Sequence, residues 1–199
     1  MKDIAIGTER YRALIEERRR KLQNRLAEIA SEPKAFVFEL GAGHGHFLTA
    51  YARKHPDTLC IGVDIASDRV VRAQRKCDRG KLANLHFLHT DAWLFLETLP
   101  AGLAIADVFV LFPDPWPKSR HHKHRIMQSP FLDLVATRAS ATSRFFFRTD
   151  FAPYFEHAQT LVRAHARWQL TDEPWPFECE TVFQNRSTGY QSLVARRRS

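Results

Sequence analysis

The order of apolar and helical segments constrains the fold of this chain more than any other feature. Five short apolar runs predict buried strands, at residues 35–40, 59–64, 84–89, 106–112 and 144–149. Helical stretches lie between them, near 46–55, 67–79, 91–98 and 128–139. Because strand and helix alternate strictly, we expect an α/β fold with a doubly wound, mostly parallel sheet and right-handed crossovers.

Both ends of the chain depart from this alternation. Residues 8–31 form one charged helical stretch, in which apolar side chains recur at near-helical spacing. At the other end, residues 153–165 are typical of a helix, while 167–171 and 190–197 are typical of two closing strands. We therefore expect seven strands and a helical arm that precedes them.

The length and composition fit a single domain of ordinary size. With 199 residues, of which 44% are apolar, the chain can bury a core, and we divide it into a basic helical arm (1–31) and one domain (32–199). No segment approaches the roughly 20 apolar residues of a membrane span, and the start lacks the apolar stretch of a secretory signal. The three cysteines, Cys60, Cys77 and Cys179, are far apart in the sequence and odd in number, which predicts reduced thiols. We expect a cytoplasmic protein.

The charge balance favours a polyanionic partner. Lys and Arg total 30 against 22 acidic residues, which gives a formal net charge of +8. Basic residues gather at three places, 18–21, 118–125 and 196–198. The first and last clusters suit a solvated helix face and a chain end as well as contact with RNA, so both interpretations stay open. The middle cluster directly follows a motif that carries chemistry.

A glycine-rich turn follows the first predicted strand, with the sequence Glu39-Leu40-Gly41-Ala42-Gly43-His44-Gly45-His46. Glycines are needed there because the backbone can then pass close to a ligand. A dinucleotide site requires a small residue three positions after Gly43, and this chain has His46 there, which disfavours NAD. An acid before the first glycine suits a zwitterionic amino-acid group, and the turn resembles that of S-adenosylmethionine-dependent methyltransferases.

Two more acids follow the next two predicted strands. Asp64 ends the second strand, where a carboxylate can accept hydrogen bonds from ribose hydroxyls. Asp91 follows the third strand, where an acceptor can meet an adenine amino group. Each acid alone is typical of a helix cap. Together with Glu39 they line one crevice at the carboxyl ends of successive strands, which is where open α/β sheets bind ligands.

A proline-rich loop follows the fourth predicted strand, with the sequence Phe112-Pro113-Asp114-Pro115-Trp116-Pro117-Lys118. Alternating prolines stiffen the loop and remove backbone donors, so it presents Asp114 and Trp116 in a fixed way. A carboxylate beside an aromatic face suits a base that has been flipped out of its stack. His121, His122 and His124 have no usual metal-site spacing, so we expect no metal and favour contact with phosphate.

These motifs together resemble the bacterial tRNA (guanine-N7-)-methyltransferase family. The resemblance rests on the glycine turn, on the proline loop with its basic continuation to Arg125, and on Arg148-Thr149-Asp150, and it runs from about residue 36 to 186. It implies a Rossmann-like S-adenosylmethionine-dependent methyltransferase that modifies a guanine of the tRNA variable loop. The implied cofactor is S-adenosyl-L-methionine and the implied partner is tRNA, while monomer and homodimer stay open.

The resemblance also implies roles for individual residues. The residues expected to bind the cofactor are Glu39, Gly41, Gly43, Asp64, Asp91 and Asp114, and Asp114 is also expected to be catalytic. The residues expected to contact the substrate are Lys118, Asp150, Thr181, Phe183 and Gln184. Guanine N7 carries a lone pair and no proton, so the site needs in-line placement and a negative group rather than a general base.

The chain departs from the family pattern at two segments. The Pro-Gly-Gly turn that usually precedes the fifth strand is replaced by Ala139-Ser140-Ala141-Thr142-Ser143. Further on, Gln184 stands where the family has Glu, and Ser187 stands where it has Phe. We expect the first change to be harmless and the second to affect recognition of the substrate.

Three other functions compete with this interpretation. An enzyme acting on an exocyclic base amine would have to remove a proton, and the loop offers no second aspartate or asparagine for that. A non-catalytic RNA-binding relative is disfavoured by the intact acids and mildly favoured by Gln184. An NAD-binding α/β protein is disfavoured by His46.

Overall fold

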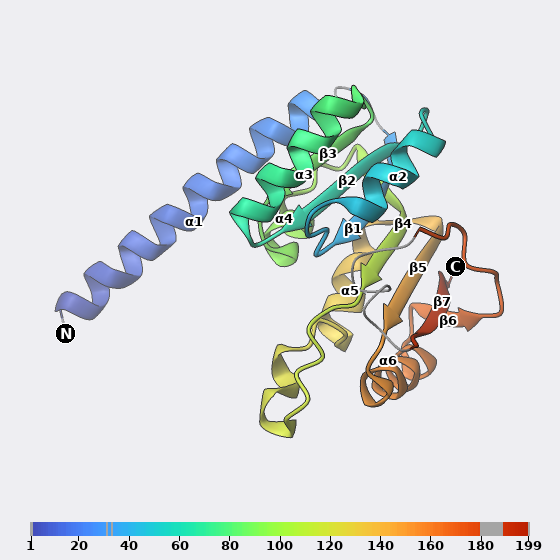
Figure 1. Cartoon of the computed structure of the whole chain (residues 1–199). Helices are drawn as coiled ribbons and strands as arrows, with labels where there is room; N and C mark the ends of the chain where they lie inside the picture. The colour runs from blue at the N-terminus through green and yellow to red at the C-terminus, as the bar shows by residue number, and fades with distance from the viewer. Residues whose placement is uncertain (1, 31, 33, 180–188, 199) are drawn as a thin grey trace.

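The computed structural model describes residues 2–30, 32, 34–179 and 189–198. Their strands form one seven-stranded sheet in the order β3-β2-β1-β4-β5-β7-β6 (Figure 1). The strands are β1 (Lys34–Leu40), β2 (Leu59–Asp64), β3 (Leu85–His89), β4 (Leu103–Leu111), β5 (Ala139–Thr149), β6 (Trp168–Thr171) and β7 (Gln191–Arg197). Strands β1 to β5 are parallel, whereas β7 runs antiparallel to β5 and β6. The expected doubly wound, mostly parallel sheet is confirmed.

Helices cover both faces of this sheet. They are α1 (Lys2–Ile29), α2 (His46–Lys54), α3 (Ser67–Gly80), α4 (Ala92–Thr98), α5 (Ser129–Arg138) and α6 (Ala152–Ala164), with a short 3-10 helix η1 (Ser119–His124). One core cluster packs α4, α5, α6 and the last turns of α1 against the sheet. The other cluster packs α2 and α3 against the opposite face. The predicted helices are all present, and their ends agree with the prediction to within a few residues, except at the start of α1.

An extended segment around Trp175 and Phe177 covers part of the sheet face on which α2 and α3 lie. Trp175 packs edge-on against Phe109 of β4 and Phe146 of β5. Two residues later, Phe177 packs against Phe47 and Tyr51 of α2. These aromatic contacts cover β4 and β5 on this face with only a few residues of chain.

Helix α1 joins the body through its C-terminal half. Leu22 and Leu26 are buried in the first core cluster, and Arg19 forms an ion pair with Glu97 of α4 at 3.0 Å. Further toward the N-terminus, Tyr11 and Leu14 are exposed. With 28 residues the helix is about 42 Å long, and Figure 1 shows its N-terminal part extending away from the sheet. None of the described helices is long and apolar enough to span a membrane.

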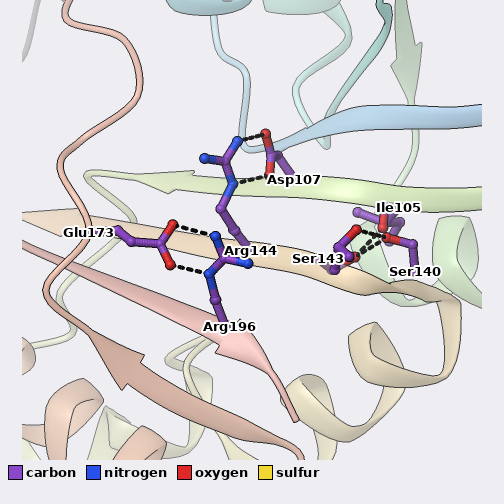
Figure 2. A network of polar contacts seen from close by, with 8 residues as sticks. Ile105, Asp107, Ser140, Ser143, Arg144, Glu173 and Arg196 are labelled. Carbon is purple, nitrogen blue, oxygen red and sulfur yellow. Dashed lines mark hydrogen bonds and ion pairs between the residues drawn. The ribbon is translucent and has the colours of Figure 1, made fainter. Parts of the chain in front are cut away.

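The segment that replaces the family's Pro-Gly-Gly turn is part of β5. The strand begins at Ala139, directly after α5, whereas the sequence predicted a start at Arg144. Its pairing with β4 shifts after Ala139, so that Arg144 lies opposite Asp107. Figure 2 shows Ser143 donating to the Ile105 carbonyl beside this shift, and Arg144 forming two hydrogen bonds with Asp107 at 2.9 and 2.7 Å.

A second ion pair extends this polar network to the antiparallel strands. Arg196 of β7 pairs with Glu173, and it lies opposite Arg144 in the register of β5 and β7 (Figure 2). The two arginines therefore each have their own carboxylate, which keeps like charges on neighbouring strands from repelling. The network fixes how β7 closes the sheet.

Candidate functional site

The candidate site lies at the carboxyl ends of the parallel strands. Strand β1 has β2 on one side and β4 on the other, so the connections from the centre of the sheet leave in opposite directions. At such a switch point the loops separate and leave a crevice for a ligand. The residues Glu39, Asp64, Asp91, Asp114 and Asp150 all lie at or just beyond the carboxyl ends of β1 to β5.

The glycine turn between β1 and α2 requires three left-handed residues. Gly41, Gly43 and Gly45 have φ values of 69°, 52° and 68°, which other residues adopt only with strain. Gly41 has open space where a Cβ would lie, as expected for a backbone that a ligand can approach. A Cβ on Gly45 would instead meet Phe87 at 2.6 Å, so that glycine is required by packing against β3.

Glu39 is the most unusual carboxylate of the site. Its side chain is 4% exposed, the Leu48 N–H donates to it, and Oε2 has no partner among the described residues. Burial raises the pKa of Glu39 to about 8, and the neighbouring Asp64 adds to this, while the Leu48 hydrogen bond opposes it. A buried carboxylate oxygen without a donor is suited to a cationic group such as an ammonium.

Asp64 links the glycine turn to the end of β2. One carboxylate oxygen accepts the Gly43 N–H and the other accepts the Ala66 N–H, both at 2.8 Å. The side chain is buried, so this carboxylate shapes the turn as well as lining the crevice. Each oxygen keeps a second lone pair for another donor, and its contact with a ribose stays a prediction.

An apolar residue, Ile65, follows β2, and a polar one, Asp91, follows β3. Ile65 is 75% exposed directly after Asp64, and an exposed isoleucine at this place can cover the face of a planar ring. Asp91 accepts the Leu94 N–H at 2.9 Å, which confirms its role as the N-cap of α4. The His89 ring lies 3.0 Å from the Ile65 carbonyl and joins the two loops.

Helix α1 forms one wall of a cavity beside Asp91. The cavity has a volume of about 470 Å³, and Ile65, His89, Thr90 and Asp91 line one side of it. Arg18, Lys21 and Arg25 line the other side. The sequence alone indicates no chemistry for the arm, because helical spacing does not show which loop a helix will lie against.

The proline loop after β4 is held in a strained shape. Phe112 and Trp116 have φ values of 48° and 42°, which are costly for bulky side chains. The Phe112 N–H donates to the Arg148 carbonyl at 2.8 Å. At the other end of the loop, Arg125 donates to the Pro115 carbonyl at 2.9 Å, and a second nitrogen lies 3.5 Å from the Trp116 carbonyl. Asp114 stands exposed between these two anchors.

Arg125 corrects one expectation from the sequence. It belongs to the basic cluster 118–125, whose charge favours a polyanionic partner, but its side chain is buried and its guanidinium lies 4.8 Å from the centre of the Tyr154 ring. The Tyr154 hydroxyl in turn accepts the Met127 N–H. Arg125 therefore holds the loop from inside, and only its neighbours are available to a partner.

The rest of the basic cluster is exposed on η1. Lys118, Arg120 and Lys123 are all exposed and form no ion pair with a described residue. The rings of His121 and His124 lie 5.7 and 5.2 Å from the Trp116 ring, so the indole is partly covered. The described part of the chain contains no group of side chains suited to a metal ion.

Arg148 organises the fifth strand end. Its guanidinium is buried, forms two hydrogen bonds with Glu178 at 2.9 and 2.8 Å, and donates to Ser192 at 2.8 Å. It lies between the rings of Trp175 and Tyr190, at 4.0 and 4.4 Å. In the sequence this arginine stands out only as part of a motif, because its partners are 27 to 44 residues away.

The predicted substrate residues divide into two groups. Lys118 and Asp150 are exposed beside the crevice, on the loops after β4 and β5. Thr181, Phe183 and Gln184 lie outside the described residues. Arg148 contacts chain on both sides of that segment, and Tyr190 packs edge-on against Phe112 of the proline loop at 5.9 Å.

Comparisons with known proteins agree with this geometry. A family described as "Putative methyltransferase" matches residues 33–198. Proteins named tRNA (guanine-N(7)-)-methyltransferase are similar: one from Treponema pallidum is 35% identical over 159 residues, which cover 79% of this chain and 64% of that protein. One from Nitrosococcus oceani is 32% identical over 149 residues, covering 74% and 63%. The chain thus spans somewhat less than two thirds of the length of these relatives.

Solved structures with the same fold are more distant in sequence. The 16S rRNA methyltransferase KamB has a TM-score of 0.61 at 19% identity, covering 86% of this chain and 92% of that one. TrmN from Thermus thermophilus has a TM-score of 0.60 at 14% identity, covering 88% and 48%. A Streptococcus mutans protein described as a "putative methyltransferase" in complex with SAH has a TM-score of 0.56 at 8% identity, covering 83% and 90%. At these identities the likeness shows the fold.

Proposed function

The chain belongs to the family described as "Putative methyltransferase", and from this premise we propose that it is an S-adenosylmethionine-dependent tRNA (guanine-N7-)-methyltransferase. The relatives of that name support the substrate, and the acids at the strand ends support the cofactor. Such an activity would place the protein in the cytoplasm, with tRNA as its partner. The division into a basic helical arm (1–31) and a catalytic domain (32–199) is part of the proposal.

The residues of the crevice fit S-adenosylmethionine. Glu39 offers a buried carboxylate oxygen without a partner, which suits the ammonium of the amino-acid group. Gly41 and Gly43 leave the turn open to a ligand, and Asp64 lies beside it with free lone pairs for ribose hydroxyls. Ile65 and Asp91 supply an apolar face and an acceptor for adenine. When bound, the cofactor supplies an electrophilic methyl group on a positively charged sulfur.

The observation that carries the proposed reaction is a single exposed carboxylate on a loop fixed at both ends. Asp114 lies between the anchors at Phe112 and Pro115, and the loop holds no second acid or amide to accept a proton. Guanine N7 has a lone pair and no proton, so methylation there needs placement and charge stabilisation only. Asp114 supplies a negative charge that stabilises the ring as it becomes cationic.

Substrate positioning is assigned to residues around this loop. Lys118 follows the three prolines and is placed to contact a phosphate, while Asp150 can accept hydrogen bonds from guanine or ribose. Thr181, Phe183 and Gln184 are proposed to contact the base, by their match to the family motif. The aromatic and ionic contacts of Arg148 support this, because they hold the neighbouring residues Glu178 and Tyr190 at the strand ends.

The test is chemical mapping of the product. Bulk tRNA treated with the protein and S-adenosylmethionine is reduced with borohydride and cleaved with aniline, which breaks the chain at N7-methylguanine. We expect one cleavage site, in the variable loop, and much weaker cleavage there after the same reaction time with the Asp114→Asn variant. Methyl transfer without aniline cleavage would assign the methyl group to another atom and would refute the proposal.

A further inference from the structure

Helix α3 carries a dense row of cations that the clusters found in the sequence do not include. The five cations are Arg69, Arg72, Arg75, Lys76 and Arg79. The opposite side of the helix buries its apolar residues against the sheet. Cations spaced three or four positions apart therefore share one outward side of the helix.

The row borders a groove between α3 and the glycine turn. Arg72, Arg75, Lys76 and Arg79 line it from the helix, and His44 and His46 line it from the turn. Its volume is about 640 Å³, and a neighbouring hollow of about 280 Å³ extends it toward Arg53 of α2. The groove is thus concave and positively charged along its length.

Acidic side chains do not neutralise this charge. Asp78 is the one acid that lines the groove, and it accepts a hydrogen bond from Gln74 at 2.8 Å. None of the α3 cations forms an ion pair with another described residue. Burial, followed by the charge of Arg79, lowers the pKa of Lys76, so the cations already repel one another. An anion in the groove would relieve this repulsion.

The groove is joined directly to the proposed cofactor site. Lys76 donates to the His44 carbonyl at 2.8 Å and lies 2.9 Å from Nε2 of His46. Both histidines belong to the glycine turn, which also contains Gly41 and Gly43 of the proposed cofactor site. From Arg72 to Arg79 the helix rises about 10 Å, which corresponds to roughly three nucleotides of a helical strand.

We infer that this groove binds the phosphate backbone of tRNA, on the side of the glycine turn that faces α3. The inference rests on the proposed function and adds a contact surface to it, on the α3 side of the glycine turn. Guanidinium groups that contact phosphate oxygens do not read sequence, so the groove would contribute to affinity and placement rather than to the choice of base. The unpaired row of cations gives the groove this chemistry.

The test compares two triple variants that lose the same charge. In the first, Arg72, Arg75 and Arg79 become Ala, while Lys76 and both histidines stay, so the glycine turn keeps its contacts. In the control, Lys34, Arg163 and Arg167 become Ala; these exposed cations lie near the amino ends of the strands. Affinity for bulk tRNA is measured over a salt series, together with tRNA methylation and calorimetric binding of S-adenosylhomocysteine.

We expect the α3 variant to bind tRNA at least about tenfold more weakly, with a salt slope reduced by about two to three units. Its affinity for S-adenosylhomocysteine should equal that of the wild type, and its methylation should be restored at high tRNA concentration. Equal tRNA binding by the two variants, with a wild type that methylates tRNA, would overturn the inference about the groove alone. A wild type that does not methylate tRNA would overturn the proposed function, and this inference with it.

Discussion

The guanidinium of Arg125 donates to the backbone carbonyl of Pro115 at 2.9 Å from a fully enclosed position beside Tyr154. This contact fixes the carbonyl end of the loop that presents Asp114. Trp116, two residues after Asp114, has a strained positive φ. The loop therefore needs such an anchor to keep its shape. The buried arginine is therefore a positioning residue for the exposed carboxylate.

Replacing Arg125 by Lys should lower turnover more than it weakens cofactor binding. A lysine cannot reach both loop carbonyls with a planar fork, so the loop would relax and Asp114 would move. A displacement of about 1 Å can cost on the order of 100-fold in rate. Steady-state kinetics measure the effect, with Lys123→Ala as the exposed control. A normal kcat in the Arg125→Lys variant would show that the loop does not depend on this anchor.

The Asp114→Asn change should lower kcat and leave tRNA affinity nearly unchanged. The amide keeps the size of the side chain but removes the negative charge, which matters most once guanine N7 has become cationic. Loss of one such electrostatic contact costs on the order of 100-fold or more in kcat. Single-turnover rates and tRNA binding are compared on the same preparation. Parallel losses in rate and binding would contradict a role in the transition state.

Binding of S-adenosylhomocysteine should depend on pH through Glu39. Its pKa of about 8 in the free protein means that the carboxyl is mostly protonated at neutral pH. A cationic ammonium favours the ionised form, so binding should release a proton, and affinity should rise with pH between about 6 and 7.5, by up to about tenfold per unit. Calorimetry in buffers of different ionisation enthalpy measures the proton release. Glu39→Gln should bind more weakly and without this pH dependence.

The same shift predicts how the free protein responds to pH. The carboxyl has an ordinary value of 4.5 when unfolded and is raised in the folded state, so folding favours its protonated form. This contribution is fully present below about pH 4.5 and is lost as the pH rises toward about 8. In thermal unfolding without ligand, the Tm of the wild type should fall more steeply as the pH rises over this range than the Tm of Glu39→Gln. Identical profiles would mean that Glu39 is not perturbed.

Changing Asp64 should affect both the cofactor and the fold of the turn. Asp64→Ala removes two acceptors of backbone N–H groups as well as the proposed contact with ribose. We expect at least about tenfold weaker binding of S-adenosylhomocysteine and a loss of unfolding free energy of about 1–3 kcal/mol. The Asp64→Asn variant keeps one acceptor, so its affinity and its unfolding free energy should lie between those of the wild type and of Asp64→Ala. Unchanged affinity would refute the assignment.

The Gln184→Glu change should make the protein faster on bulk tRNA. A guanine offers two adjacent donors, N1–H and N2–H, which a carboxylate accepts together, whereas glutamine accepts one and turns a donor toward the other. We expect roughly a tenfold gain in kcat/KM, with the same nucleotide modified. Aniline cleavage identifies that nucleotide. A slower variant, or one that methylates another base, would mean that Gln184 sets a different specificity.

Most of the fold could be predicted from the sequence because local patterns determine it. The strands that pair in parallel are buried on both faces, so their apolar runs are easy to recognise. The start of β5 differs from the prediction because residues 139–143 are small and mostly polar, so they form no apolar run although they belong to the strand. The prediction for β4 also begins too late, since the strand starts at Leu103.

The candidate site could be predicted in part for a similar reason. The acids at the strand ends follow from the alternation of elements, which places the carboxyl ends of parallel strands together. The burial of Arg125 could not be distinguished from the exposure of Lys123, because it depends on Tyr154 in a later helix. The cations of α3 were visible in the sequence, at intervals of three and four, but the glycine turn that completes their groove is distant in sequence.

One guanidinium, that of Arg148, holds the chain on both sides of residues 180–188, through Glu178 and Trp175 before them and Tyr190 and Ser192 after them. Because one side chain makes all of these contacts, they are coupled, and loss of the guanidinium would remove them on both stretches of chain at once. The end of β5 is therefore stabilised as one cooperative unit, and substitutions at its four partners should have effects that do not add.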